Sequence, residues 1–184
     1  MYLLIQTIWW LSMSAENKSE RASMEQKKAI HVLGRALVVV DDQLLVNMNS
    51  KLPFFFLPGG HVEHGESVAD AVVRELQEEL GLPSCIERYV GCFEYRFIPH
   101  VATKCHSHEY NFIYEVTVPG LQAGKIPLSP EDHTQFAWIP LKDLQQSDVR
   151  PEALKKVLVV WLHDKKNAAF ASCMERNDEV EGKK

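Results

Sequence analysis

The 184-residue sequence has few cysteines, and none of them are spaced as zinc ligands usually are. Cys85, Cys92, Cys105 and Cys173 include no Cys-x-x-Cys pair. A zinc-binding or disulfide-stapled class of protein is therefore not expected. Free thiols in a reducing compartment are the simplest interpretation, and they predict a cytoplasmic protein.

The chain also lacks net positive charge and a long apolar run. Its formal net charge is −5, and its basic residues occur as scattered pairs. A groove that binds nucleic acid is not expected, so DNA is excluded as a partner and RNA is disfavoured. The most apolar stretch, residues 1–13, is too short to span a bilayer and lacks the positive start of a secretory signal. We expect no stable membrane span.

Two changes in composition divide the chain into three parts. Residues 1–28 join the apolar start to a polar, charged stretch without periodicity, and we predict a flexible N-terminal extension. Residues 29–164 contain the periodic segments and form one compact domain. Residues 165–184 are polar and are predicted to be a flexible C-terminal tail.

The order of periodic segments predicts the fold class. A helix is expected between Ser67, a good N-cap, and Gly81, a common helix stop. Proline at the first turn predicts a second helix over 150–163. Strands are expected over 30–40 and 44–48, joined by a hairpin turn, and over 86–98, 108–118 and 134–139. This order indicates an α/β (α+β) fold with a mixed β-sheet between helices.

The first helix carries acidic residues where a helix does not favour them. Glu75 is three residues from Glu78 and four from Glu79, so these like charges face one another. Glu78 and Glu79 also lie in the last turn, where the helix dipole disfavours anions. A bound divalent cation would compensate, and oxygen ligands suit Mg²⁺ or Mn²⁺. The alternative is an acidic face exposed to solvent.

The residues around this acidic cluster favour the metal interpretation. Leu57-Pro58-Gly59-Gly60 lies between an apolar run and the helix, and its glycines permit a tight turn whose backbone faces a ligand. Arg74 and Glu66 have opposite charge, and arginine can hold a carboxylate in a forked pair that fixes the loop to the helix. The alternative for this pair is a surface ion pair of little energetic value.

Residues Gly60 to Leu82 resemble a complete Nudix box. The pattern is Gly, five residues, Glu, seven residues, Arg-Glu, an aliphatic residue, any residue, Glu-Glu, any residue, Gly and an aliphatic residue. Every fixed position is satisfied. The resemblance implies a Nudix-type α/β/α sandwich over residues 29–164, with a mixed sheet between helices.

The resemblance also implies roles for the residues of the box. Glu75, Glu78 and Glu79, with the carbonyl of Gly59, would bind Mg²⁺, for which Mn²⁺ can substitute. Arg74 and Glu66 would orient the helix and loop of the catalytic site. The general base would be a box glutamate, with Glu75 and Glu78 as candidates, or a carboxylate outside the box.

Further site residues are expected outside the box. A fourth acidic ligand often follows the later strands, and Glu131 or Asp132 fit that place, with Glu109 and Glu115 as other candidates. Glu109 is also a candidate substrate contact. Phe55 could stack on a nucleobase, although an aromatic run before a glycine turn is more often part of the core. Each of these acids could equally be a surface carboxylate.

The implied activity is Mg²⁺-dependent cleavage of the diphosphate bond in a nucleoside diphosphate-linked small molecule. A nucleoside triphosphate, a nucleotide sugar, ADP-ribose or a dinucleoside polyphosphate would be the substrate. The alternatives are a non-catalytic domain that senses a nucleotide and an enzyme that removes pyrophosphate from RNA 5′ ends. Paired domains are common in this family, so a homodimer is a further expectation.

Overall fold

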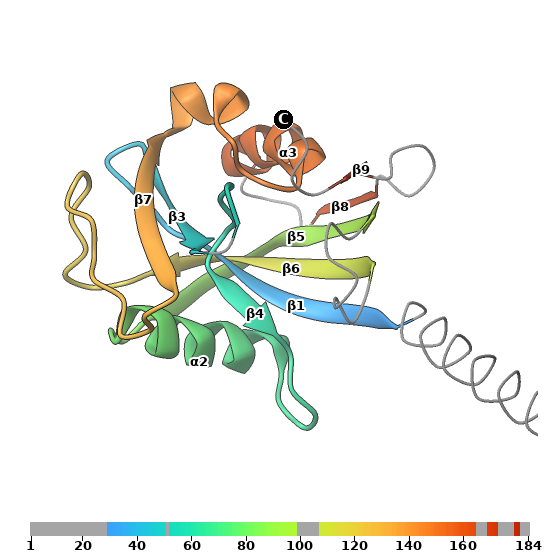
Figure 1. Ribbon diagram of the computed structural model, residues 1–184, viewed down its shortest axis with the longest axis horizontal. Coiled ribbons are helices and arrows are strands. Elements are labelled where there is room, and N and C mark those ends of the chain that lie inside the picture. The colour runs from blue at the N-terminus through green and yellow to red at the C-terminus, as the bar shows by residue number, and fades with distance from the viewer. Residues whose placement is uncertain (1–28, 51, 99–106, 165–168, 173–178, 181–184) are drawn as a thin grey trace, which may run out of the picture.

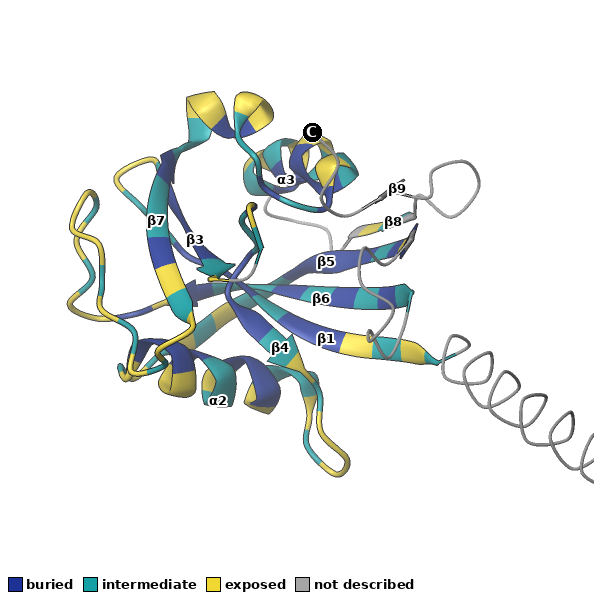
Figure 2. Ribbon diagram, in the orientation of Figure 1, coloured by how far each residue is buried: buried dark blue, intermediate teal, exposed yellow. Residues whose placement is uncertain are grey.

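The computed structural model describes residues 29–50, 52–98, 107–164, 169–172 and 179–180 (Figure 1). The extension predicted over residues 1–28 lies outside the described residues. The described strands form two sheets, which the helices cover on opposite sides (Figure 1). Figure 2 shows that the buried residues lie where the helices face the sheets and along the strands themselves.

The larger sheet is mixed, as predicted. β1 pairs in parallel with β6, β4 pairs antiparallel with β1, and β5 pairs antiparallel with β6. β8 and β9 both pair in parallel with β5. The strands of this sheet are β1 (Ile30–Leu37), β4 (Gly59–His61), β5 (Cys85–Ile98), β6 (His108–Thr117), β8 (Ala169–Ser172) and β9 (Glu179–Val180).

A second, three-stranded antiparallel sheet was not predicted. It consists of β2 (Val39–Val40), β3 (Gln43–Asn49) and β7 (Thr134–Pro140). The segment predicted as one strand over 30–40 divides at Val38, so β1 and β2 belong to different sheets. The hairpin turn is where it was expected, and its residues Asp41 and Asp42 both have positive φ. Side-chain periodicity alone does not show which sheet a strand joins.

The two α-helices within the described residues lie on opposite faces of the larger sheet. α2 (Val68–Leu80) packs on one face through Val72, Leu76 and Leu80. α3 (Glu152–His163) covers the other face together with the 3₁₀ helix η1 (Leu141–Gln146). Leu154, Leu158 and Trp161 of α3 belong to a second apolar cluster on that side. The predicted layers of helix, sheet and helix are confirmed.

The ends of α2 are defined by the residues that the sequence indicated. The Ser67 hydroxyl oxygen accepts a hydrogen bond from the Asp70 amide at 3.1 Å and so satisfies a free N–H of the first turn. Gly81 has a left-handed conformation, and its amide bonds to the carbonyl of Gln77. These caps fix the register of the helix and therefore the direction in which its glutamates point.

Within the flexible tail predicted over 165–184, the structure describes two short segments, and the rest lies outside the described residues. Residues 169–172 and 179–180 form β8 and β9, and both pair with β5. A strand at the edge of a sheet offers unpaired N–H and C=O groups, which a short segment can complete. Composition indicated only that this segment is polar.

Replacing Gly59 by alanine is expected to destabilise the fold strongly. Gly59 has a φ of 118°, and a Cβ atom there would lie 2.2 Å from the carbonyl oxygen of Gly34 on β1. This overlap is with backbone, so β1 and β4 must separate, at a cost of at least about 3 kcal/mol. Urea unfolding measures the loss.

The matched control is Gly65→Ala. Gly65 has a φ of 91°, but nothing lies within 4 Å of its Cβ position. Only backbone strain of about 1–2 kcal/mol is expected there. A loss of stability at Gly59 no larger than the loss at Gly65 would contradict the close approach of the two strands.

Candidate active site

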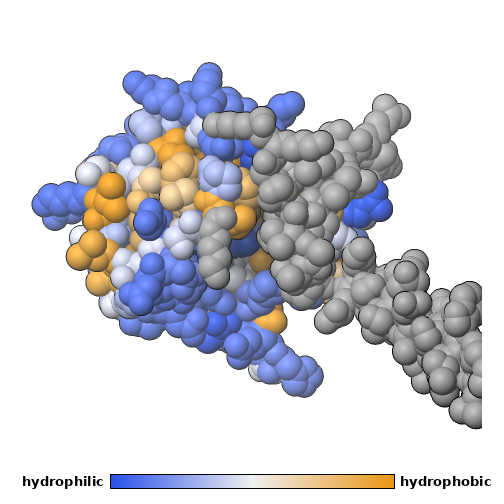
Figure 3. All heavy atoms as spheres, in the orientation of Figure 1, coloured by the Kyte–Doolittle hydropathy of each residue, from blue (hydrophilic) through white to orange (hydrophobic). Residues whose placement is uncertain are grey.

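α2 places its three glutamates at different depths. The Glu78 side chain is 50% exposed and the Glu75 side chain 18% exposed, whereas Glu79 as a whole residue is only 7% exposed. The helix therefore directs one carboxylate into the protein, one along its surface and one toward solvent. The surface over α2 and the turn before it is hydrophilic (Figure 3).

The buried carboxylate of Glu79 has two hydrogen-bond donors. The Gly59 amide donates to one oxygen at 3.0 Å, and the Asn47 side-chain amide on β3 donates to the other at 2.5 Å. Burial raises the pKa of the Glu79 carboxyl to about 8, and the Gly59 hydrogen bond and the positive charge of Arg35 oppose this shift. A cation beside Glu79 would offset the cost of burying its charge.

The Glu75 carboxylate lies against the backbone of Gly60. A Cβ atom at Gly60 would be 2.5–2.6 Å from the carboxylate atoms of Glu75, so only glycine leaves room for this group. Burial raises the pKa of Glu75, and the nearby Arg74 opposes the rise. A side chain at Gly60 would therefore displace the Glu75 carboxylate.

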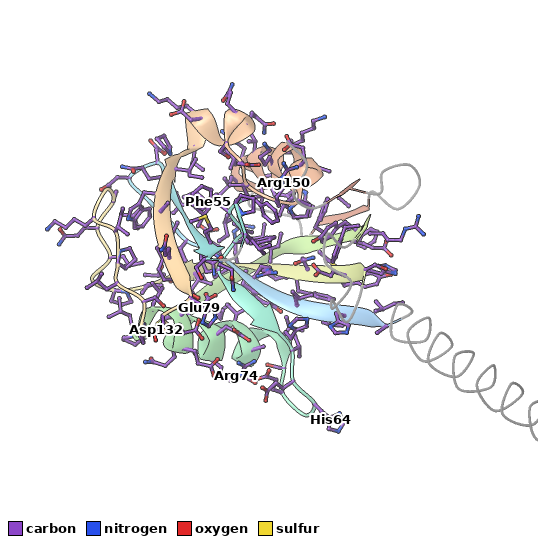
Figure 4. All side chains as sticks on the ribbon, in the orientation of Figure 1. Phe55, His64, Arg74, Glu79, Asp132 and Arg150 are labelled. Carbon is purple, nitrogen blue, oxygen red and sulfur yellow. The ribbon has the colours of Figure 1, made fainter. Side chains whose placement is uncertain are left out.

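Arg74 on the helix is paired with Glu66 in the loop that precedes the helix, as predicted. Its Nε and Nη2 donate to the two oxygens of Glu66 at 3.2 and 2.8 Å, and Nη2 also donates to the carbonyl of His61. Its Nη1 lies 3.0 Å from Glu75 and 3.3 Å from Glu78. The hydrogen bonds from Arg74 and from the Glu63 amide lower the pKa of Glu66. In Figure 4, Arg74 lies beside the turn whose tip carries His64.

The donor set suits a hard divalent cation. In the part of the chain that the structure describes, no three His, Cys, Asp or Glu side chains already surround a common metal position. Arg74 instead lies between Glu75 and Glu78. Among the described residues, the acidic groups whose charges act on Glu79 are the carboxylates of Glu75 and Glu131, which supply oxygen ligands, and a buried carboxylate with a raised pKa is stabilised by a cation. The residues present therefore fit a Mg²⁺-type ion.

The carbonyl of Gly59, predicted as a metal ligand, accepts a hydrogen bond from Arg35. Nη1 of Arg35 donates to the carbonyl oxygens of Gly59 at 2.7 Å and of Leu57 at 3.2 Å. A carbonyl oxygen has two lone pairs, so this contact leaves one for a second partner. Its role as a ligand stays a prediction.

Ser129 attaches the loop that carries Glu131 to the end of α2. The Ser129 hydroxyl donates to the backbone carbonyl of Glu79 at 2.7 Å and accepts from the Glu131 amide at 3.1 Å. The charge of Glu131 contributes to the raised pKa of Glu79, so the structure brings these two carboxylates together. Thr134 donates to Glu131 at 2.8 Å. Asp132, the neighbouring candidate, is exposed.

The remaining candidates lie away from the helix acids. Phe55 packs against the apolar cluster under α3, and its backbone pairs with Asp148 and Arg150. Phe55 therefore packs in the core, which was the alternative expected from the sequence. Its stacking on a nucleobase stays a prediction. Glu115 pairs with Arg88 at 2.6 Å on the larger sheet.

Glu109 lies on β6, where it is buried and accepts a hydrogen bond from the Asn111 side chain at 3.2 Å. The side-chain oxygen of Asn111 in turn accepts from Nε of Arg35 at 3.1 Å. Glu109 therefore reaches the site through two other side chains. Its part in substrate binding is untested.

Three residues that sequence analysis did not single out help to build the site: Asn47, Arg35 and Ser129. Each makes at least one hydrogen bond to a distant segment of the site, with separations of 32 residues for Asn47 to Glu79, 24 for Arg35 to Gly59 and 50 for Ser129 to Glu79. No periodic pattern signals such contacts. The available signal was a polar residue directly beside apolar residues within a strand, as at Asn47 and Arg35.

Comparison with known proteins gives the family of the chain. The NUDIX domain family matches residues 30–160. An ADP-ribose pyrophosphatase from Methanocaldococcus jannaschii is 35% identical over 128 residues, which cover 68% of this chain and 70% of that protein. An isopentenyl-diphosphate Delta-isomerase from Cereibacter sphaeroides is 30% identical over 111 residues, 60% of each chain.

A solved structure of a NUDIX hydrolase from Nitrosomonas europaea shares the fold. Its TM-score is 0.58 at 21% identity, and the match covers 76% of this chain and 93% of that chain. These similarities define a protein of the Nudix fold. The chain belongs to the NUDIX domain family and is a Nudix hydrolase, an enzyme acting on acid anhydrides in phosphorus-containing compounds.

Nudix hydrolases generally use a divalent metal and act on small nucleotide-derived substrates. Of the helices that the structure describes, none has the length and apolar character needed to cross a lipid bilayer. Both cysteines within the described residues, Cys85 and Cys92, are free thiols.

Proposed function

We propose that the protein is a Mg²⁺-dependent pyrophosphohydrolase that cleaves the diphosphate bond of a nucleoside diphosphate-linked small molecule. The observation that carries this proposal is the set of three helix carboxylates at graded depth. Arg74 joins Glu75 and Glu78 to Glu66 in the loop before the helix, and the Gly59 amide joins Glu79 to the glycine turn. Loss of these acids would be expected in a domain that only senses a nucleotide. All three are present.

ADP-ribose is the first compound to test. The Methanocaldococcus relative is named for it, and that match extends over more of this chain than the match to the isomerase. Both relatives are named for a diphosphate compound, which supports diphosphate recognition as the shared property. The cytoplasmic location and the homodimer remain predictions from sequence.

The carboxylates of the site would have two roles in the reaction, cation binding and proton transfer. Glu75, Glu78 and Glu79 would hold the cation, which when bound neutralises charge on the phosphoryl oxygens. A carboxylate of the site accepts a proton from water, whose oxygen forms a bond to phosphorus. The bond between phosphorus and the bridging oxygen breaks in line, and that oxygen leaves with the second phosphate. The products are a nucleoside monophosphate and a phosphorylated group.

Removing divalent metal is expected to abolish hydrolysis. The experiment measures products from ADP-ribose, nucleoside triphosphates, nucleotide sugars, dinucleoside polyphosphates and isopentenyl diphosphate, with Mg²⁺ and with EDTA. Turnover of one nucleotide with Mg²⁺, lost with EDTA and restored by excess Mg²⁺, is the predicted result. A rise in melting temperature with Mg²⁺ alone is also expected, because a ligand of the native state stabilises it. Tight binding of a compound without turnover would instead support the sensing alternative.

A further inference from the structure

The site has more acidic groups than basic groups, and its principal arginine is fully occupied. Three nitrogens of Arg74 bond to Glu66, Glu75, Glu78 and the carbonyl of His61. A diphosphate substrate brings further negative charge to the same place. Besides a metal ion, the site therefore needs a cation that no carboxylate has neutralised.

Arg35 on β1 has this property. Its hydrogen bonds go to the carbonyls of Leu57 and Gly59 and to the side-chain oxygen of Asn111. Among the described residues, Arg35 forms no ion pair with a carboxylate. Its positive charge nevertheless acts to lower the pKa of both Glu75 and Glu79. Arg35 is thus a cation beside the carboxylate cluster whose charge is left for a ligand.

The orientation of this guanidinium is fixed on two sides. Nη1 is held by the carbonyls of the turn, and Nε by Asn111, which itself donates to Glu109. Nη2 bonds to no residue in the described part of the chain, and it is not among the buried atoms without a partner. One edge of the arginine is therefore positioned and is not fully buried. A fixed guanidinium edge suits the oxygens of a phosphate group.

We propose that Arg35 binds the substrate's diphosphate through its Nη2 edge, and that Asn111 and Glu109 are positioning residues that hold it in place. This inference rests on the proposed function and deepens it, because it names how a diphosphate is recognised next to the metal-binding acids. The ring of Phe56, with its centroid 6.0 Å from the Arg35 guanidinium carbon, supports the same orientation.

A purely structural role for Arg35 predicts a different response to mutation. If Arg35 only held the turn carbonyls, its loss would loosen Gly59, whose amide orients Glu79, and binding of both metal and diphosphate would weaken. If Arg35 binds phosphate, its loss weakens the diphosphate only. Metal binding is then unchanged or tighter, because a positive charge beside the metal ligands has been removed.

The test compares Arg35→Gln, Arg35→Lys and the wild type in two titrations. Calorimetry measures the affinity for α,β-methylene-ADP in the presence of Mg²⁺, and thermal shift measures Mg²⁺ alone. Arg35→Gln is expected to weaken analogue binding about 10–100-fold and to leave the Mg²⁺ midpoint unchanged or lower. Arg35→Lys restores part of the affinity, because it keeps the charge but not the planar edge.

Arg88→Gln is the matched control, since Arg88 is paired with Glu115 outside the carboxylate cluster and should not affect analogue binding. Unchanged analogue affinity in Arg35→Gln, or parallel weakening of analogue and Mg²⁺, would overturn the inference. Analogue binding that depends on Arg35 in a protein without any hydrolase activity would support the inference while overturning the proposed function.

Asn111→Leu tests the positioning role. This change removes the acceptor of Arg35 Nε and the donor to Glu109 but keeps the volume of the side chain. A raised KM with little change in kcat is expected, because the phosphate is bound less well while the helix acids are undisturbed. Glu109→Gln keeps an acceptor for Asn111, so a smaller rise in KM than in Asn111→Leu is expected. Equal loss of kcat in both variants would overturn the positioning role.

Discussion

Replacing Glu78 by glutamine is expected to lower turnover about 10²–10⁴-fold while the protein stays folded. Glu78 is half exposed and has one polar contact, a 3.3 Å approach to Arg74. Its charge also lies in the last turn of α2, where the helix dipole disfavours an anion. A carboxylate that contributes so little to the folded state can be removed without structural loss, so lost activity reports directly on chemistry.

The measurement is kcat with the best substrate at saturating Mg²⁺, together with the melting temperature. Glu87→Gln is the matched control, because Glu87 is an exposed glutamate on β5. It makes the same chemical change away from α2 and should leave kcat unchanged. A large drop in melting temperature in Glu78→Gln would show that Glu78 is structural, and full activity would remove it from the metal-binding set.

Local chemistry made the helix and its cluster predictable. Ser67 and Gly81 end α2 through contacts within a few residues, and the spacing of Glu75, Glu78 and Glu79 fixes their common face. The pairing of Arg74 with Glu66 was also predictable, because opposite charges on the helix and the preceding loop are close along the chain. These interactions depend on short sequence separations, which periodicity and spacing describe.

The inner layer of the site was not predictable in the same way. Asn47 bonds to Glu79 from a strand of the second sheet, and nothing local to β3 shows that this sheet meets the end of α2. Arg35 reaches the turn because β4 pairs with β1. Such contacts follow from the order of strands in the sheets, which one sequence does not specify. Phe55 shows the same limit for a substrate contact. The sequence allowed it either to stack on a nucleobase or to pack in the core, and in the structure it packs against the apolar cluster under α3.

Gly60→Ala is expected to lower turnover as much as removing Glu75 does, because the two residues occupy one space. The Gly60 conformation is not among the positive-φ glycines, so alanine can adopt the backbone. The added methyl group would overlap the Glu75 carboxylate at 2.5–2.6 Å, and a flexible side chain yields before the strand does. Glu75 would then rotate away from Arg74, and the fold would survive.

A double-mutant cycle tests this mechanism. If the alanine acts only by displacing Glu75, then Gly60→Ala/Glu75→Gln has the same kcat as Glu75→Gln alone, and the two effects are not additive. If the alanine instead distorts β4, the double variant loses activity multiplicatively and its melting temperature falls. The first outcome would establish that Gly60 is required because the Glu75 carboxylate occupies the space beside it. Glycine would then be needed at position 60 because the side chain of Glu75, 15 residues later in the sequence, fills the space beside it. The backbone conformation of Gly60 would not be the reason.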